Sequence, residues 1–235
     1  MSPFEPSVTR RPGGSQIIPE PAVRRPGPIP PWWDAAADLS LSTVVSRLEQ
    51  NVSSVNATSS PRVDERISAV MAILVDGDDG AEVLLTRRSS SLNNHRGEIS
   101  FPGGRADEGE SIVDAARRET FEEVGIDAAD LMVHSELSPL STFVSRSYIV
   151  PVIASLPHKP ALRLNAHEVE RAFWVPLTEL VRPDTYAAEI WAFRRFDRSE
   201  DRPTEQAMHF FFLDDETVWG ATARMLHELL CLVHS

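Results

Sequence analysis

The amino-acid sequence predicts an α/β fold in which helices cover the faces of a mixed β-sheet. Two observations support this. Short apolar runs rich in β-branched residues recur between residues 67 and 213, and only a few helical patterns separate them. The chain has 235 residues, of which 42% are hydrophobic, so a substantial core is available. Strands and helices both bury an apolar face, and packed layers satisfy both.

The amino-terminal region has an unusual composition. The first 31 residues hold nine of the 18 prolines. Proline lacks a backbone donor, so little regular structure is expected here. We interpret residues 1–35 as a proline-rich tail, or as an arm that lies across a partner. Residues 36–62 are expected to form a helix, over 39–50, followed by a polar linker.

The main domain is expected over residues 63–235. Residues 67–75 are typical of a buried strand, residues 76–80 of an Asp/Gly turn, and residues 81–86 of the returning strand. An apolar-faced helix is predicted over residues 219–233. Further strands are predicted over residues 131–133, 148–153, 169–175, 191–196 and 208–213.

Charge and cysteine content exclude several classes of function. The formal net charge is −12 and no block of Lys or Arg stands out, so nucleic-acid binding is not expected. The apolar runs are too short to cross a bilayer, and no apolar segment follows the early arginine pairs. The single cysteine, Cys231, cannot form an intramolecular disulfide, which fits a cytoplasmic protein.

A carboxylate-rich helix is predicted over residues 112–124, with Ser111 as its N-cap and Gly125 after its last turn. Glu119 and Glu123 lie about 40° apart on the helical wheel, and as a like-charged i,i+4 pair they cost about 0.2–0.5 kcal/mol. Glu122 flanks them. A divalent cation would offset this repulsion. The alternative is an acidic helix facing solvent.

The surrounding residues resemble the signature of a known family. Residues 104–126 match the spacing Gly-x5-Glu-x7-Arg-Glu-U-x-Glu-Glu-x-Gly-U, where U is bulky and apolar. This resembles the Nudix box of the Nudix hydrolases. Ile126 fills the second U position, and Thr120 fills the first as a mild departure.

The resemblance implies a Nudix-type α/β/α sandwich with a mixed β-sheet, in which the box forms a loop-helix-loop. It also implies hydrolysis of a nucleoside diphosphate linked to another group, with Mg²⁺ or Mn²⁺ as the cofactor. A diphosphate is strongly anionic and repels an attacking oxygen. Divalent cations neutralise that charge and orient the phosphates.

The resemblance also assigns roles within the box. It implies that Glu119 and Glu123 are metal ligands, and that Glu122 is a further ligand or activates water. Arg118 and Glu110 would hold the helix and the preceding loop in shape through an ion pair.

The general base differs between branches of the family. It is a glutamate of the box or a carboxylate from a later loop. Glu168, about 45 residues after the box and just before a predicted strand, is the favoured outside base. Glu170 is its rival, and a plain surface acid is the alternative for both. Gly103 or Gly104 is expected to offer a backbone carbonyl to the metal.

The stretch before the box indicates a branch. Residues 84–104, LLTRRSSSLNNHRGEISFPGG, resemble the pattern L-L-T-x-R-[S/A]-x3-R-x3-G-x3-F-P-G-G of coenzyme A diphosphatases. The departure is Asn93, where the pattern has arginine, a planar donor for phosphate. His95 and Arg96 lie close enough in sequence to compensate. Two later segments, ERAFWVPLTEL and DETVWGATARML, also resemble this branch.

The reaction implied is water attack on the diphosphate of coenzyme A, giving 4′-phosphopantetheine and adenosine 3′,5′-bisphosphate. Because the substrate carries a further phosphate, Arg87, Arg88 and Arg96 are candidate substrate contacts. Aromatic residues could line a base or pantetheine pocket, although such residues are more often part of a core. These are Trp174, Trp191, Phe193 and Trp219.

Other functions stay open. One is a Nudix diphosphatase for ADP-ribose, a dinucleotide or an oxidised nucleoside triphosphate, which the missing arginine favours. Another is a non-catalytic nucleotide sensor, although such proteins usually lose box glutamates and none is lost here. Isomerases share the fold, but Cys231 lies far from the box. A homodimer is an expectation from the family.

Overall fold

The computed structural model describes residues 16–19, 21, 23–33, 37–52, 60–91, 96–142, 146–193 and 204–235. Part of the expected linker, residues 53–59, lies outside them, as do Asn93 and His95. No helix within these ranges is long and apolar enough to cross a bilayer.

The main sheet has eight strands and is mixed, as the sequence predicts. Its path is β4–β3–β2–β8–β6; β9 pairs with β3, β5 with β2, and β7 with β8. β2 and β8 are parallel, and the other described pairings are antiparallel. The strands are β2 (Arg66–Gly77), β3 (Gly80–Arg88), β4 (Ile99–Ser100), β5 (Gly103–Arg105), β6 (Met132–Glu136), β7 (Leu140–Ser141), β8 (Ser147–Ser155) and β9 (Val169–Pro176).

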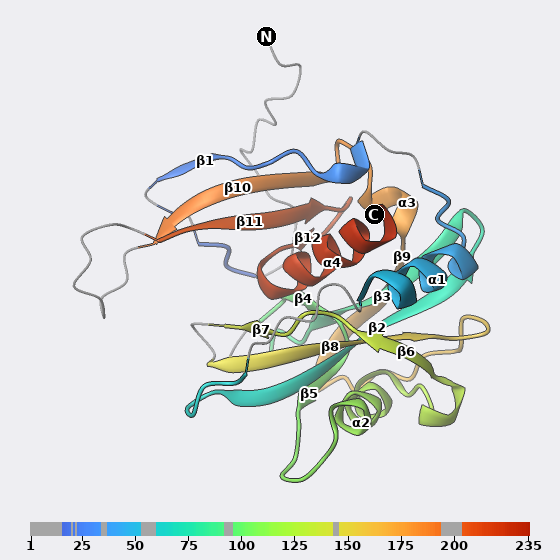
Figure 1. The fold of residues 1–235 in the computed structure, drawn as a ribbon. Helices are drawn as coiled ribbons and strands as arrows, with labels where there is room; N and C mark the ends of the chain where they lie inside the picture. Colours follow the sequence, from blue (N-terminus) through green and yellow to red (C-terminus); the bar gives the residue numbers. More distant parts are fainter. Residues whose placement is uncertain are drawn as a thin grey trace.

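Helices cover both faces of this sheet, which makes the predicted sandwich (Figure 1). Side chains of β2 alternate between the two faces. Met71 and Ile73 belong to a core beneath α2 (Ile112–Val124), called here the α2 core. Ala72 and Leu74 belong to a larger core, called the α4 core, with α1 (Leu41–Val52) and α4 (Gly220–Val233).

A second sheet lies beyond α4, an arrangement that the sequence does not reveal. It is antiparallel in the order β1–β10–β11–β12, and α4 lies between the two sheets (Figure 1). Its strands are β1 (Arg24–Pro26), β10 (Tyr186–Phe193), β11 (Thr204–Phe212) and β12 (Thr217–Val218). The short elements η1 (Pro31–Trp33), η2 (Ala128–Asp130) and α3 (Leu177–Leu180) complete the chain.

The amino-terminal segment departs from the expectation of little regular structure. β1 pairs with β10, and the Gly27 N–H donates to the Ala188 carbonyl at 2.7 Å. Trp32 is buried in the α4 core. The physical reason is local: arginines between the prolines keep their donors for sheet pairing, and a buried tryptophan contributes a large apolar area. The boundaries 1–35, 36–62 and 63–235 stay predictions.

A cluster of aromatic and imidazole rings fills the space beneath Trp32. The Tyr186 hydroxyl lies 2.8 Å from His209 Nδ1, and the rings of His209 and His227 stack with centroids 3.9 Å apart. The Trp32 ring packs on Tyr186 and on His227. The pKa of His209 is lowered to about 3, chiefly by burial and also by His227 and Arg224. Burial lowers the pKa of His227 to about 4.

These histidines predict acid sensitivity. Their pKa in the unfolded chain is near 6.5, so the unfolded state takes up protons below that pH while the folded state stays neutral. The contribution of these two rings to the free energy of unfolding is present in full above pH 6.5. It is lost as the pH falls toward the pKa values of the folded state, by up to about 1.4 kcal/mol per pH unit for each ring. Urea unfolding between pH 7 and 5 measures the loss.

The matched variants are His209→Gln and His158→Gln. His209→Gln removes a buried ring and should flatten the pH dependence. His158 is exposed, so its replacement should leave the dependence unchanged. If the free energy of unfolding fell equally steeply with pH in the wild type and in His209→Gln, the role of the buried histidines in acid sensitivity would be contradicted.

Candidate active site

The carboxylate helix α2 begins and ends where its sequence predicts. The Ser111 Oγ accepts a hydrogen bond from the Asp114 N–H at 3.1 Å, which caps the first turn. Gly125 has φ of 74°, and its N–H donates to the Phe121 carbonyl at 3.0 Å. One side of the helix packs on the α2 core through Ala115, Ala116 and Val124.

Two glycines let the start of the box approach α2 closely. The Gly103 N–H donates to Glu123 Oε2 at 3.1 Å. A Cβ at Gly104 would lie 2.5 Å from the carboxylate carbon of Glu119, so any side chain would displace that carboxylate. Gly103 itself has φ of 151°. β5 therefore lies directly against the acidic side chains of α2. The carbonyl of Gly103 as a metal ligand stays a prediction.

Three carboxylates meet at this point. Glu119 and Glu123 come from α2, and Glu168 comes from the turn before β9. One oxygen of each lies within 4.8 Å of the others. Glu123 is only 3% exposed. The cluster thus unites two ligands expected from the box with the outside carboxylate expected from the later loop.

The electrostatics of this cluster are unfavourable without a cation. The pKa of Glu123 is raised to about 7, chiefly by burial. The charges of Glu119 and Glu168 also raise it, while the Gly103 N–H and Arg88 lower it. Burial also raises the pKa of Glu119. Several carboxylate oxygens at this spacing are the donors that hard divalent cations such as Mg²⁺ and Mn²⁺ prefer. The residues present therefore fit such a cation.

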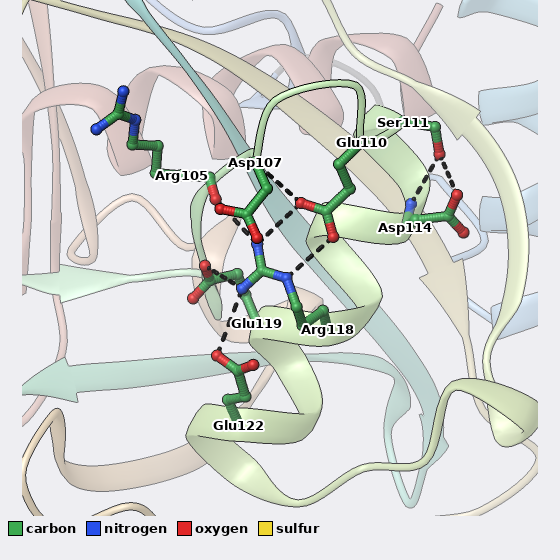
Figure 2. A network of polar contacts seen from close by, with 8 residues as sticks. All are labelled: Arg105, Asp107, Glu110, Ser111, Asp114, Arg118, Glu119 and Glu122. Atoms are coloured by element: carbon green, nitrogen blue, oxygen red, sulfur yellow. Dashed lines mark hydrogen bonds and ion pairs between the residues drawn. The ribbon is translucent and has the colours of Figure 1, made fainter.

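Arg118 fixes the outer side of the helix (Figure 2). Its guanidinium donates to both carboxylate oxygens of Glu110 at 2.9 Å, to Glu119 at 2.8 Å and to the Arg105 carbonyl at 3.0 Å. The bonds from Arg118 lower the pKa of Glu110 to about 2, assisted by the Asp107 N–H. The expected ion pair is present, and it ties the loop of the box to the helix.

Glu122 lies apart from the cluster. Its side chain is 49% exposed, and one oxygen lies 3.4 Å from the Arg118 guanidinium (Figure 2). The group of three carboxylates in the described chain does not include it. Its role as a ligand or water activator stays a prediction. Spacing alone could not separate Glu122 from Glu119, since both flank the same side of the helix.

The candidate arginines lie in different places. Arg88 is half-buried and near enough to Glu123 to lower that residue's pKa. Its buried Nε has no hydrogen-bond partner among the described residues. Arg96 is exposed in the turn before β4. Arg88 is thus the candidate that lies at the cluster.

Arg87 points to the other face of β3. Its neighbour Leu85 belongs to the α4 core, and side chains two positions apart share a face. Arg87 donates to the buried Glu216 at 2.6 Å and to Glu170 at 3.2 Å. The structure therefore does not bring Arg87 or Glu170 to the carboxylate cluster. The sequence could not reveal this, because Glu216 is 129 positions away.

The candidate aromatic residues are mostly structural. Trp191 is 1% exposed and donates to Glu189 at 2.6 Å. The Trp219 indole donates to Gln16 at 3.1 Å. Trp174 packs against the α2 core. The Phe193 side chain lies outside the described part of the chain.

Comparison with known proteins identifies the family. The family model described as the NUDIX domain matches residues 65–196. The chain belongs to the Nudix family. It is 32% identical over 204 residues to Nudix hydrolase 3 of Caenorhabditis elegans, with 79% of this chain and 82% of that protein covered. It is 36% identical to the Nudix hydrolase NudL of Photorhabdus laumondii, with 63% and 74% covered.

Among solved structures, the crystal structure of a C. elegans Ap4A hydrolase binary complex is similar. Its sequence is 25% identical, the TM-score is 0.43, and the match covers 48% of this chain and 82% of that one. Membership of the Nudix family makes this protein a hydrolase of phosphoric anhydride bonds in nucleotide derivatives. Two acids of the Nudix box, Glu119 and Glu123, belong to the carboxylate cluster.

Sequence reasoning missed one residue that contacts the carboxylate cluster. The Asn165 side chain donates to Glu168 Oε1 at 3.1 Å. The available signal was an asparagine that precedes the candidate base by three positions in a turn.

Thr120, the departure from the Nudix box, is fully buried, and its hydroxyl has no partner within the described ranges. Thr120→Val keeps the shape and removes an unpaired buried hydroxyl, so we expect stabilisation by about 1 kcal/mol. Thr86→Val is the matched control, because the buried Thr86 hydroxyl donates to the Ser100 carbonyl at 3.2 Å. That variant should lose about 1 kcal/mol. Urea unfolding measures both, and destabilisation by Thr120→Val would contradict the assignment.

Proposed function

We propose that this Nudix hydrolase cleaves the diphosphate bond of coenzyme A or a derivative, giving 4′-phosphopantetheine and adenosine 3′,5′-bisphosphate. One observation carries the proposal: the stretch that resembles the coenzyme A diphosphatase pattern begins at the strand of Arg88, which lies near Glu123, and ends at Gly103 and Gly104, which lie against Glu123 and Glu119. This proximity supports the proposal that the pattern and the acidic cluster act on the same substrate.

The residues of this site divide the chemistry among them. Glu119 and Glu123 would hold the divalent cation, which when bound neutralises and orients the diphosphate. Arg88 carries a buried Nε–H without a partner among the described residues, lies near Glu123, and would donate to a phosphate oxygen. Glu168 would accept a proton from the water whose oxygen attacks phosphorus, while the bridging P–O bond breaks.

The general base can be tested with a matched pair of variants. Glu168→Gln keeps the size and removes the proton acceptor, so kcat should fall by about 10²–10⁴-fold while KM changes little. Glu170→Gln is the control. Glu170 pairs with Arg87 on the other face of β3, so this variant should keep kcat within about threefold. Steady-state kinetics at saturating Mn²⁺ give both values, and near-normal kcat in Glu168→Gln would exclude Glu168 as base.

A second candidate function has its own observation. Asn93 stands where the coenzyme A pattern has arginine, and an amide cannot replace the charge. This favours a Nudix diphosphatase for ADP-ribose, a dinucleotide or an oxidised nucleoside triphosphate.

A substrate panel separates the two functions. Coenzyme A, dephospho-coenzyme A, ADP-ribose and NADH are compared at equal concentration with Mg²⁺ or Mn²⁺, and products are identified by mass spectrometry. We expect coenzyme A to have the highest kcat/KM, and EDTA to abolish turnover because the acidic cluster then has no cation. Dephospho-coenzyme A lacks only the 3′-phosphate and reports on its recognition. A higher kcat/KM for ADP-ribose would favour the second function. Turnover of any diphosphate excludes the sensor.

We further propose that the protein works in a reducing cytoplasm. Its only cysteine, Cys231, is half-buried in α4, and burial raises the pKa of its thiol to about 11. A thiol in that state is a poor nucleophile and resists oxidation.

A further inference from the structure

The turn that carries Glu168 is attached to the end of α2. The Arg163 N–H donates to the Val124 carbonyl at 2.9 Å, and the Asn165 N–H donates to the Glu123 carbonyl at 3.0 Å. These carbonyls belong to the last turn of α2, where no helical donor is available. The loop therefore takes the place of the missing next turn. As a consequence, one backbone contact joins Asn165 to a carboxylate residue of the cluster.

The backbone of Glu168 is also held from the opposite side. The Ser89 N–H donates to the Glu168 carbonyl at 2.8 Å. The Glu168 N–H donates to the Asn165 carbonyl at 2.9 Å. With its backbone fixed at both ends, the remaining freedom of Glu168 is rotation of its side chain.

The side chain of Asn165 limits that rotation. Its Nδ2 donates to Glu168 Oε1 at 3.1 Å, and its Oδ1 accepts from the His167 N–H at 3.2 Å. The two contacts agree on the orientation of the amide, because a flipped amide would place oxygen against carboxylate and N–H against N–H. One oxygen of Glu168 is thus occupied by a neutral donor.

We propose that Asn165 is a positioning residue, which aims the Glu168 carboxylate at the space shared with Glu119 and Glu123. The proposal rests on the function proposed above. Its basis is that Asn165 contacts two of the three cluster residues, the backbone of Glu123 and the side chain of Glu168. It therefore sets their relative position. The alternative is that Asn165 only builds the turn through its contact with His167.

Two variants separate positioning from turn formation. Asn165→Asp keeps an oxygen acceptor for the His167 N–H but cannot donate to Glu168. Asn165→Ser keeps a shorter acceptor for the turn and cannot reach Glu168. Both should lower kcat about 10- to 100-fold, as loss of a supporting hydrogen bond does elsewhere, with KM within about threefold and the melting temperature nearly unchanged. A lower melting temperature with unchanged kcat in both variants would overturn the proposal.

A double-mutant cycle tests whether Asn165 acts through Glu168. In the Glu168→Gln background, Asn165→Asp should cause no further loss, because the carboxylate that it would misplace is already absent. Equal loss in both backgrounds would overturn the proposal.

Metal binding supplies a readout independent of turnover. Mn²⁺ titration of the protein without substrate, followed by electron paramagnetic resonance, should show affinity within about threefold of wild type for Asn165→Ser, because Glu119 and Glu123 are untouched. A larger loss of affinity would assign the fall in kcat to a lost metal and overturn the proposal. Absence of diphosphate turnover in the wild type would instead refute the proposed function, whereas normal kcat in Asn165→Ser and Asn165→Asp refutes only the role of Asn165.

Discussion

Repulsion between buried carboxylates is the constraint on which this structure depends. Glu119, Glu123 and Glu168 would move apart if they were free, and burial raises the pKa of two of them. The fold opposes this separation on every side. Arg118 anchors the outer face of α2, the glycines of β5 close the inner face, and the turn before β9 supplies the third acid. Packing against the α2 core provides the energy.

Such an arrangement is useful for binding an anion that repels carboxylates. A divalent cation would offset most of the negative charge of the acidic cluster and offer open coordination positions to phosphate oxygens, and the arginine beside it adds donors for phosphate. A protein with a net charge of −12 can therefore receive a polyanionic substrate at one place. The acidic cluster lies on one face of the main sheet. Arg87 lies on the other face, the side of the α4 core, where it pairs with Glu216.

The sequence predicts the local features of this site well, because their causes are local. The caps Ser111 and Gly125 fix α2 at both ends, and the box spacing predicts the pairing of Arg118 with Glu110. The sequence does not predict which residues distant in the chain lie together in the fold. Arg87 and Arg88 are adjacent in sequence, yet strand alternation sends them to opposite faces, and only the fold decides which face receives the substrate. Composition likewise concealed Trp32 within a proline-rich segment.

The position of α4 between the two sheets has a consequence for biosynthesis. The α2 core and its carboxylates draw on residues 69–174, whereas the α4 core needs residues 220–233. During translation the α2 core can therefore assemble before α4 is made. The other face of the main sheet is then covered only in part, by α1, and its remaining apolar side chains stay exposed until α4 packs on them.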